Sequence, residues 1–110
     1  PPPLAYFCTG FVACLMTQIR AFAKRLRVEV GEVTVKAHIE WEARVEGRDP
    51  YTSRPIAFRL DIDLDSEAPF EDQKRLLDAA QKGCFVEATL ADPIPVQHKL
   101  LIDGEYRDAD

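Results

Sequence analysis

The first quarter of the chain is apolar on almost every side of the helix that it predicts. The apolar residues run from Leu4 to Ile19, and basic residues follow up to Leu26. Pro3 suits the first turn, because a proline there loses no hydrogen bond, and the basic end suits the negative pole of the helix dipole. A helix that is apolar all round packs on more than one side. We therefore predict a central helix, and we expect a second subunit to cover whatever one small domain leaves open.

Two later stretches alternate between apolar and polar residues, as half-buried strands do. In residues 33–45, and again in residues 56–64, every second residue is apolar. The polar sequence EGRDPYTSRP joins the two stretches. This pattern predicts an antiparallel hairpin with a long connection.

The rest of the chain predicts two helices and one strand. Acidic residues after Pro69 mark a helix start, and Gly83 is placed to terminate that helix. The sequence CFVEATLA predicts a short second helical piece, and HKLLID, residues 98–103, predicts a last strand. The order of elements predicts one α+β domain over residues 1–110, with helices covering one face of a sheet.

Composition and charge narrow the possible partners. The chain has 110 residues, of which 46% are hydrophobic and 30% charged, as in ordinary soluble domains. Its net charge of −5 argues against nucleic acid, which rewards a basic surface. The apolar run, interrupted by polar residues and ended by Arg20, is shorter than the roughly 20 apolar residues of a membrane helix. We therefore expect neither nucleic acid nor membrane as a partner. Because the chain begins with proline rather than methionine, we expect a missing N-terminal segment.

Neither the histidines nor the acidic residues predict a metal site. His38 falls on the polar face of the first strand, where we expect exposure, and His98 stands alone before the last strand. No cysteine and histidine share the short spacing of a zinc site. The alternating aspartates from Asp61 to Asp65 lack the glycine of a calcium loop and predict a solvated strand face.

The three cysteines are the candidate reactive groups. An odd number of cysteines without a secretory signal fits a reduced, cytoplasmic protein. Cys8 and Cys14 cannot bridge each other within one helix, because six residues rise about 9 Å, whereas a disulfide needs Cα atoms within about 7 Å. We interpret Cys8 as core filling. Gly10, Cys14 and Gln18 are four residues apart, and form a small stripe that either lines a pocket or makes a close helix–helix contact.

Cys84 adds a second candidate thiol at the start of a predicted short helix. Exposed main-chain N–H groups at such a position favour a thiolate. A thiol in a buried stripe and another at a helix start are the two parts of a peroxide-reducing dithiol. In that chemistry the first sulfur becomes a sulfenic acid, and the second condenses with it to a disulfide.

These motifs resemble the OsmC/Ohr family of thiol peroxidases, the osmotically inducible and organic hydroperoxide resistance proteins. The sequence LLDAAQKGCFVEATL is similar to the family's second cysteine motif, where a helix runs into Cys-Pro-Val-His or a relative. The resemblance covers about residues 3–103. The positions similar to the family's central-helix motif are Gly10, Ala13, Cys14, Met16 and Thr17.

The resemblance implies an OsmC-like fold, with a long central helix on an antiparallel sheet, and an intertwined homodimer with the two central helices at its heart. It implies reduction of organic hydroperoxides, with Cys14 as the attacking sulfur and Cys84 as the resolving one. Gly10 and Gln18 would then line the pocket. Members of the Ohr branch are recycled by dihydrolipoyl-type dithiols, so we expect a dithiol reductant. We expect no metal or tightly held cofactor.

The chain departs from the family pattern around both cysteines. The peroxidases that it resembles use an arginine from N-terminal strands, which we expect this chain to lack. They also use an acidic residue where this chain has Leu4 and Ala5. Phe85 replaces a common proline, and Glu87 replaces a frequent histidine. The competing hypothesis is therefore a catalytically silent OsmC-like domain that binds a small ligand or a partner.

Overall fold

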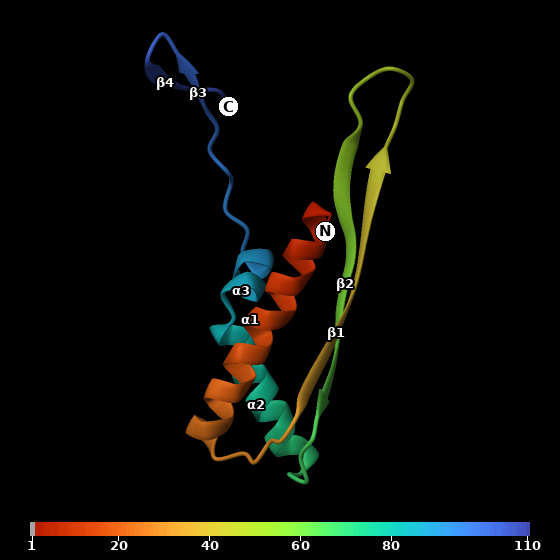
Figure 1. Ribbon diagram of the computed structural model, residues 1–110, viewed down its shortest axis with the longest axis vertical. Helices are drawn as coiled ribbons and strands as arrows, with labels where there is room; N and C mark the ends of the chain where they lie inside the picture. The colour runs from red at the N-terminus through yellow and green to blue at the C-terminus, as the bar shows by residue number, and fades with distance from the viewer. Residues whose placement is uncertain (1) are drawn as a thin grey trace.

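The computed structural model describes residues 2–110 and is organised around one long helix (Figure 1). Helix α1 contacts strand β1 on one side and helices α2 and α3 on another. The prediction of a central helix is therefore confirmed, as is the antiparallel hairpin beside it. The elements are α1 Pro3–Leu26, β1 Val33–Arg44, β2 Thr52–Leu64, α2 Phe70–Gly83, α3 Phe85–Ala91, β3 Lys99–Ile102 and β4 Glu105–Asp108.

The core follows a single row of α1 side chains. The buried residues of α1 stand at every fourth position, which places them on one face: they are Phe11, Leu15, Ile19 and Ala23. Leu76 and Ala80 of α2 belong to the same buried cluster, together with Val33 of β1. By length and composition alone α1 could also cross a membrane. Its packing against both a helix pair and a strand identifies it instead as the core helix of this fold.

Strands β1 and β2 form a long antiparallel hairpin with one irregularity. Glu40 pairs with Ala57 and Trp41 pairs with Pro55, so Ile56 is an extra residue on β2. Such a bulge bends the strand and increases its twist. Because pairing resumes beyond the bulge, β2 begins at Thr52, four residues before the predicted start. The far part of the hairpin extends past α1 (Figure 1).

The C-terminal residues form a second hairpin, of which only the first strand was predicted. Strand β3 pairs with β4 through a two-residue turn, Asp103 and Gly104, whose φ angles are 51° and 81°. Two consecutive positive φ angles are typical of the type I′ turn, and Asp-Gly is a preferred sequence for it. The turn was therefore encoded in the sequence, and reading residues 98–103 as one final strand missed it.

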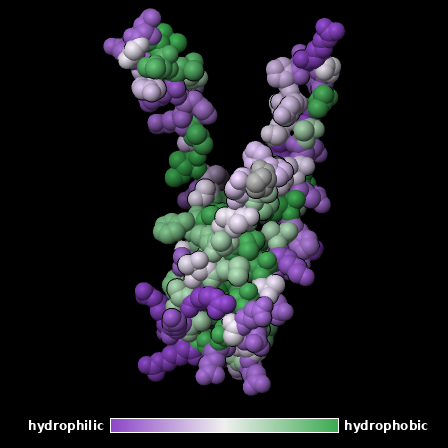
Figure 2. All heavy atoms as spheres, viewed as in Figure 1, coloured by the Kyte–Doolittle hydropathy of each residue, from purple (hydrophilic) through white to green (hydrophobic). Residues whose placement is uncertain are grey.

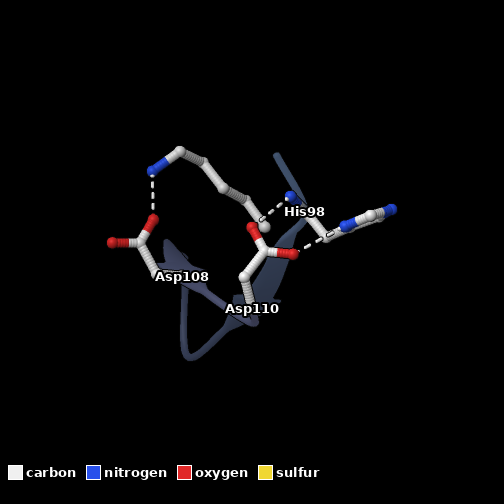
Figure 3. A network of polar contacts seen from close by, with 4 residues as sticks. His98, Asp108 and Asp110 are labelled. Carbon is white, nitrogen blue, oxygen red and sulfur yellow. Dashed lines mark hydrogen bonds and ion pairs between the residues drawn. The ribbon is translucent and has the colours of Figure 1, made fainter. Parts of the chain in front are cut away.

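Ion pairs join the two sides of this second hairpin at the end away from its turn (Figure 3). The Nδ1 atom of His98 lies 2.7 Å from a carboxylate oxygen of Asp110, and Lys99 Nζ lies 2.7 Å from Asp108. The main-chain N–H of His98 donates to Asp110, and this bond, with that of the ring, holds the pKa of Asp110 below its usual range. The expectation that His98 stands alone is wrong. His38 is half exposed, as predicted, and lies 3.0 Å from Asp61.

The overall shape is far more extended than that of a compact domain. The radius of gyration is 18.9 Å, whereas a compact chain of this length has about 13 Å. The accessible surface is 9018 Å², against about 6,100 Å² for a compact monomer of this mass. Figure 2 shows apolar side chains both on the body and on the arm that carries β3 and β4. Such a shape is consistent with an intertwined dimer.

Candidate functional site: a pair of cysteines

The structure brings Cys14 and Cys84 together, although 70 residues separate them in the sequence. Cys14 lies in the middle of α1, and Cys84 lies between α2 and α3. The Cys84 thiol donates a hydrogen bond to the Cys14 sulfur. Cys84 is 0% exposed, whereas Cys14 is partly exposed. A molecule in solution can therefore approach the first sulfur more readily than the second.

The position of Cys84 depends on the glycine before it. A Cβ atom at Gly83 would lie 2.6 Å from a ring carbon of Phe22 on α1. Glycine therefore lets the end of α2 pack directly against the Phe22 ring, which would have to move for any other residue. Gly83 is the last residue of α2, as predicted, but it lacks the positive φ of a left-handed cap. The chain turns instead at Cys84, whose extended backbone, with φ −82° and ψ 116°, ends α2 and starts α3.

The first turn of α3 directs main-chain N–H groups at the Cys14 sulfur. The N–H of Val86 has the largest influence and lowers the pKa of Cys14, and the Cys84 thiol and the N–H of Phe85 lower it further. Burial and the negative charge of Glu87 act in the opposite direction. The net result is a pKa below the usual cysteine value, which increases the thiolate fraction at neutral pH.

Cys84 has the opposite character. Burial is the main cause that raises its pKa, and its hydrogen bond to Cys14 and the charge of that sulfur raise it further. The N–H groups of Glu87 and Val86 oppose this shift without reversing it. The prediction that its place at a helix start favours a thiolate on Cys84 is therefore wrong. The N–H groups of this turn lower the pKa of Cys14 instead, because α1 brings that sulfur across them.

Of the other two predicted pocket residues, Gln18 lies at a contact between helices and Gly10 faces open space. The Oε1 atom of Gln18 lies 3.4 Å from the position of a Cβ at Gly83, so Gln18 borders the α2–α3 junction. Gly10 is exposed, and a Cβ there would meet no atom within 4 Å. Within one chain, the stripe therefore faces the junction at Cys14 and Gln18 but not at Gly10.

Glu87 is a residue of this site that the sequence marked only as a departure from the family pattern. It lies in the first turn of α3, and its Oε2 atom is buried without a hydrogen-bond partner in the described part of the chain. Burial raises the pKa of the Glu87 carboxyl, and its charge in turn raises the pKa of Cys14. Its position three residues after Cys84 was the available signal, because residues at that spacing share one helix face.

Two hollows of the surface lie away from the thiol pair. A cavity of about 850 Å³ lies at the C-terminal end of α1, and its lining includes Arg20, Lys24 and Asp65 but neither thiol of the pair. A second, apolar groove of about 380 Å³ runs along α1 and is lined by Cys8, Thr9, Val12, Ala13 and Met16. Cys8 therefore borders an open groove, and the interpretation of Cys8 as core filling does not hold within one chain. Across residues 2–110, no three His, Cys, Asp or Glu residues are grouped as metal ligands.

Comparison with known proteins gives a consistent result. A family model described as OsmC-like protein matches residues 1–99. The structure is similar to the crystal structure of an OsmC-like hydroperoxide resistance protein from Jannaschia sp. CCS1, with a TM-score of 0.95 and 44% sequence identity. The alignment covers 99% of this chain and 72% of that one. No curated protein matches the chain. The chain therefore belongs to the OsmC-like protein family.

Proposed function

We propose that the protein is a cysteine-based peroxidase that reduces organic hydroperoxides, with Cys14 attacking and Cys84 resolving. The hydrogen-bonded contact between the two thiols carries this proposal. The more accessible sulfur has the lowered pKa, and the buried sulfur keeps its proton. The Jannaschia protein is described as a hydroperoxide resistance protein, which supports the same class of substrate here.

The proposed reaction has two steps and consumes two thiols. The Cys14 thiolate attacks the terminal oxygen of the hydroperoxide, the O–O bond breaks, and an alcohol leaves. Cys14 is then a sulfenic acid. The Cys84 sulfur attacks the Cys14 sulfur, water leaves, and a disulfide forms. A dithiol reductant returns both cysteines to thiols by exchange, so the protein needs neither a metal nor a bound cofactor. The three free cysteines fit a reducing cytoplasm, where we place the protein.

Trapping the disulfide tests this proposal. The reduced protein receives one equivalent of an alkyl hydroperoxide, is quenched with an alkylating reagent, and is mapped by peptide mass spectrometry. We expect a Cys14–Cys84 disulfide within seconds, with Cys8 alkylated. If all three cysteines remain alkylated thiols, the peroxidase proposal fails, and the chain is a silent OsmC-like domain that binds a small ligand or a partner.

We further infer that the working form is a homodimer. The groove along α1 is apolar and open, and within residues 2–110 large apolar side chains are exposed both on the hairpin of β1 and β2 and on the hairpin of β3 and β4. Neither thiol of the pair lines the two hollows described above, so a second copy that packs on α1 would complete a pocket over Cys14. Exposed apolar surface on this scale marks an interaction surface.

Sedimentation equilibrium checks the dimer. We expect a molar mass of twice 12.4 kDa for the reduced protein at micromolar concentration. Adding a reductant should leave the mass unchanged, because packing and not a disulfide would join the copies. A species of 12.4 kDa over the whole concentration range would contradict the inference.

A further inference from the structure

We propose that Glu87 is the proton donor to the alcohol that leaves when Cys14 attacks a hydroperoxide. This inference rests on the proposed peroxidase function and assigns one further residue to that same site. It concerns a position that the sequence comparison marked only as a departure from the family pattern, where a histidine is frequent.

Glu87 lies at the same turn of helix as both sulfurs of the pair. Glu87 shares the first turn of α3 with Phe85 and Val86, whose N–H groups point at the Cys14 sulfur. Its own N–H points at the Cys84 sulfur. The carboxyl group is near enough for its charge to act on Cys14. Both sulfurs of the pair and this carboxyl group therefore meet at one turn of helix.

One carboxylate oxygen of Glu87 lacks a hydrogen bond. The Oε2 atom of Glu87 is buried, and no partner among residues 2–110 satisfies it. A buried polar atom without a partner costs roughly 1–3 kcal/mol, and an unpaired buried charge costs more. A hydroperoxide bound over Cys14, in the pocket that a second copy would complete, would supply the partner once the carboxyl group turns toward it. The carboxyl group is therefore an orphan in the resting chain that a bound hydroperoxide can satisfy.

The Cys14 sulfur and the Glu87 carboxyl group compete for one negative charge. Two anions so close to each other in a partly buried site do not both ionise readily. Burial raises the pKa of Glu87, while N–H groups lower the pKa of Cys14. Among the described residues, the charge of Glu87 acts on Cys14 of α1, the main-chain N–H of Glu87 contacts the Cys84 sulfur, and Lys82 in the last turn of α2 is exposed. Burial and the neighbouring thiolate both favour the acid form of Glu87, and the proposed step takes place when the sulfur carries the charge and the carboxyl group carries the proton.

The proton balance of the reaction then closes within the site. The Cys14 thiolate bonds to the terminal oxygen of the hydroperoxide, and the departing alkoxide takes the proton of Glu87. The products are the Cys14 sulfenic acid, an alcohol and the Glu87 carboxylate. That carboxylate then accepts the proton of the Cys84 thiol, and Cys84 attacks the Cys14 sulfur. The same proton leaves with the sulfenic hydroxyl as water, and exchange with the dithiol restores a proton to Glu87.

A comparison of two oxidants tests this role. Cumene hydroperoxide releases an alkoxide, which needs a proton, whereas peracetic acid releases acetate, which does not. For Glu87→Gln, we expect the rate of Cys14 oxidation by cumene hydroperoxide to fall about 100-fold or more. The rate with peracetic acid should stay within about threefold of the unmodified protein. The matched control is Glu71→Gln, which changes an exposed glutamate of α2 and should leave both rates unchanged.

The pH profile gives a second readout that a purely structural role would not produce. With cumene hydroperoxide, the rate should rise as Cys14 ionises and fall again as Glu87 loses its proton. In Glu87→Gln the falling limb should be absent. Equal losses with both oxidants in Glu87→Gln would mean that Glu87 only supports the fold, and unchanged rates with both would exclude it from the step. If the unmodified protein itself forms no Cys14–Cys84 disulfide with either oxidant, the proposed function fails rather than the role of Glu87.

Discussion

Replacing Cys14 with serine is expected to abolish peroxide reduction. A serine hydroxyl at this place has no accessible anion at neutral pH, whereas the N–H groups of Val86 and Phe85 favour a thiolate on Cys14. Removing an attacking group of this kind costs on the order of 10³-fold or more. The measurement is hydroperoxide consumption in the presence of a dithiol, followed at several enzyme concentrations.

Cys8→Ser is the matched control for that variant. Cys8 lies on the same helix but borders the open groove and not the thiol pair. Serine is nearly the same size as cysteine, so Cys8→Ser should leave the groove and the packing of a second copy intact, keep a rate close to the unmodified one, and form the same disulfide. Full turnover by Cys14→Ser, or its loss in Cys8→Ser alone, would reassign the attacking sulfur.

Replacing Cys84 with serine is expected to separate the two chemical steps. The first oxidation should continue within about tenfold of its usual rate, because a serine hydroxyl can still donate a hydrogen bond to the Cys14 sulfur. Condensation cannot follow, so Cys14 should accumulate as one sulfenic acid per chain. Turnover with the dithiol should fall by at least about tenfold. A sulfenic-acid trapping reagent and intact-protein mass spectrometry measure both results.

Two results of the Cys84→Ser experiment would contradict this assignment. If Cys84→Ser turns over as fast as the unmodified protein, the dithiol reduces the Cys14 sulfenic acid directly and Cys84 has no resolving role. If Cys84→Ser no longer reacts with hydroperoxide at all, its thiol proton is essential to the first step as well. Cys8→Ser again controls for the loss of a cysteine.

In the proposed reaction, the order of the two steps follows from a single hydrogen bond. When Cys84 donates its proton to the Cys14 sulfur, it lowers the pKa of Cys14 and raises its own. The same hydrogen bond therefore favours the thiolate of Cys14 and keeps the Cys84 thiol protonated. Cys84 becomes the better nucleophile only after the Cys14 sulfur has lost its negative charge by oxidation.

Residue periodicity predicts most of the elements because it reports which faces are buried. The alternation in β1 recurs in the structure as alternating exposed and less exposed side chains, whereas the all-round apolar pattern of α1 does not single out its buried row. Periodicity does not report what covers an exposed apolar face. The apolar groove at Val12 and Met16 therefore looks the same in sequence as a face covered within the chain. The Asp103–Gly104 turn was predictable from its sequence, and was missed because the following strand is short and polar.

The site was predictable in its residues but not in its geometry. The two cysteines stand out by their motifs, yet their contact depends on how closely α2 approaches α1, and Gly83 packs against Phe22 where the two helices meet. A contact of this kind joins two residues far apart in sequence. The distribution of N–H groups between Cys14 and Cys84 depends on the same crossing, so the sequence assigned the favourable environment to the wrong sulfur.

The hairpin of β1 and β2 and the hairpin of β3 and β4 both extend beyond the core, and this affects how the chain folds. Its described residues include only nine buried apolar side chains, a small core for a chain that must offset the ordering of 110 residues. If two copies supply the missing cover to each other, folding and assembly are one equilibrium, and dilution acts as a denaturant. The active pocket would then exist only at concentrations where the chains meet. Supply of the protein, and not only of its reductant, would set how much peroxide-reducing capacity is present.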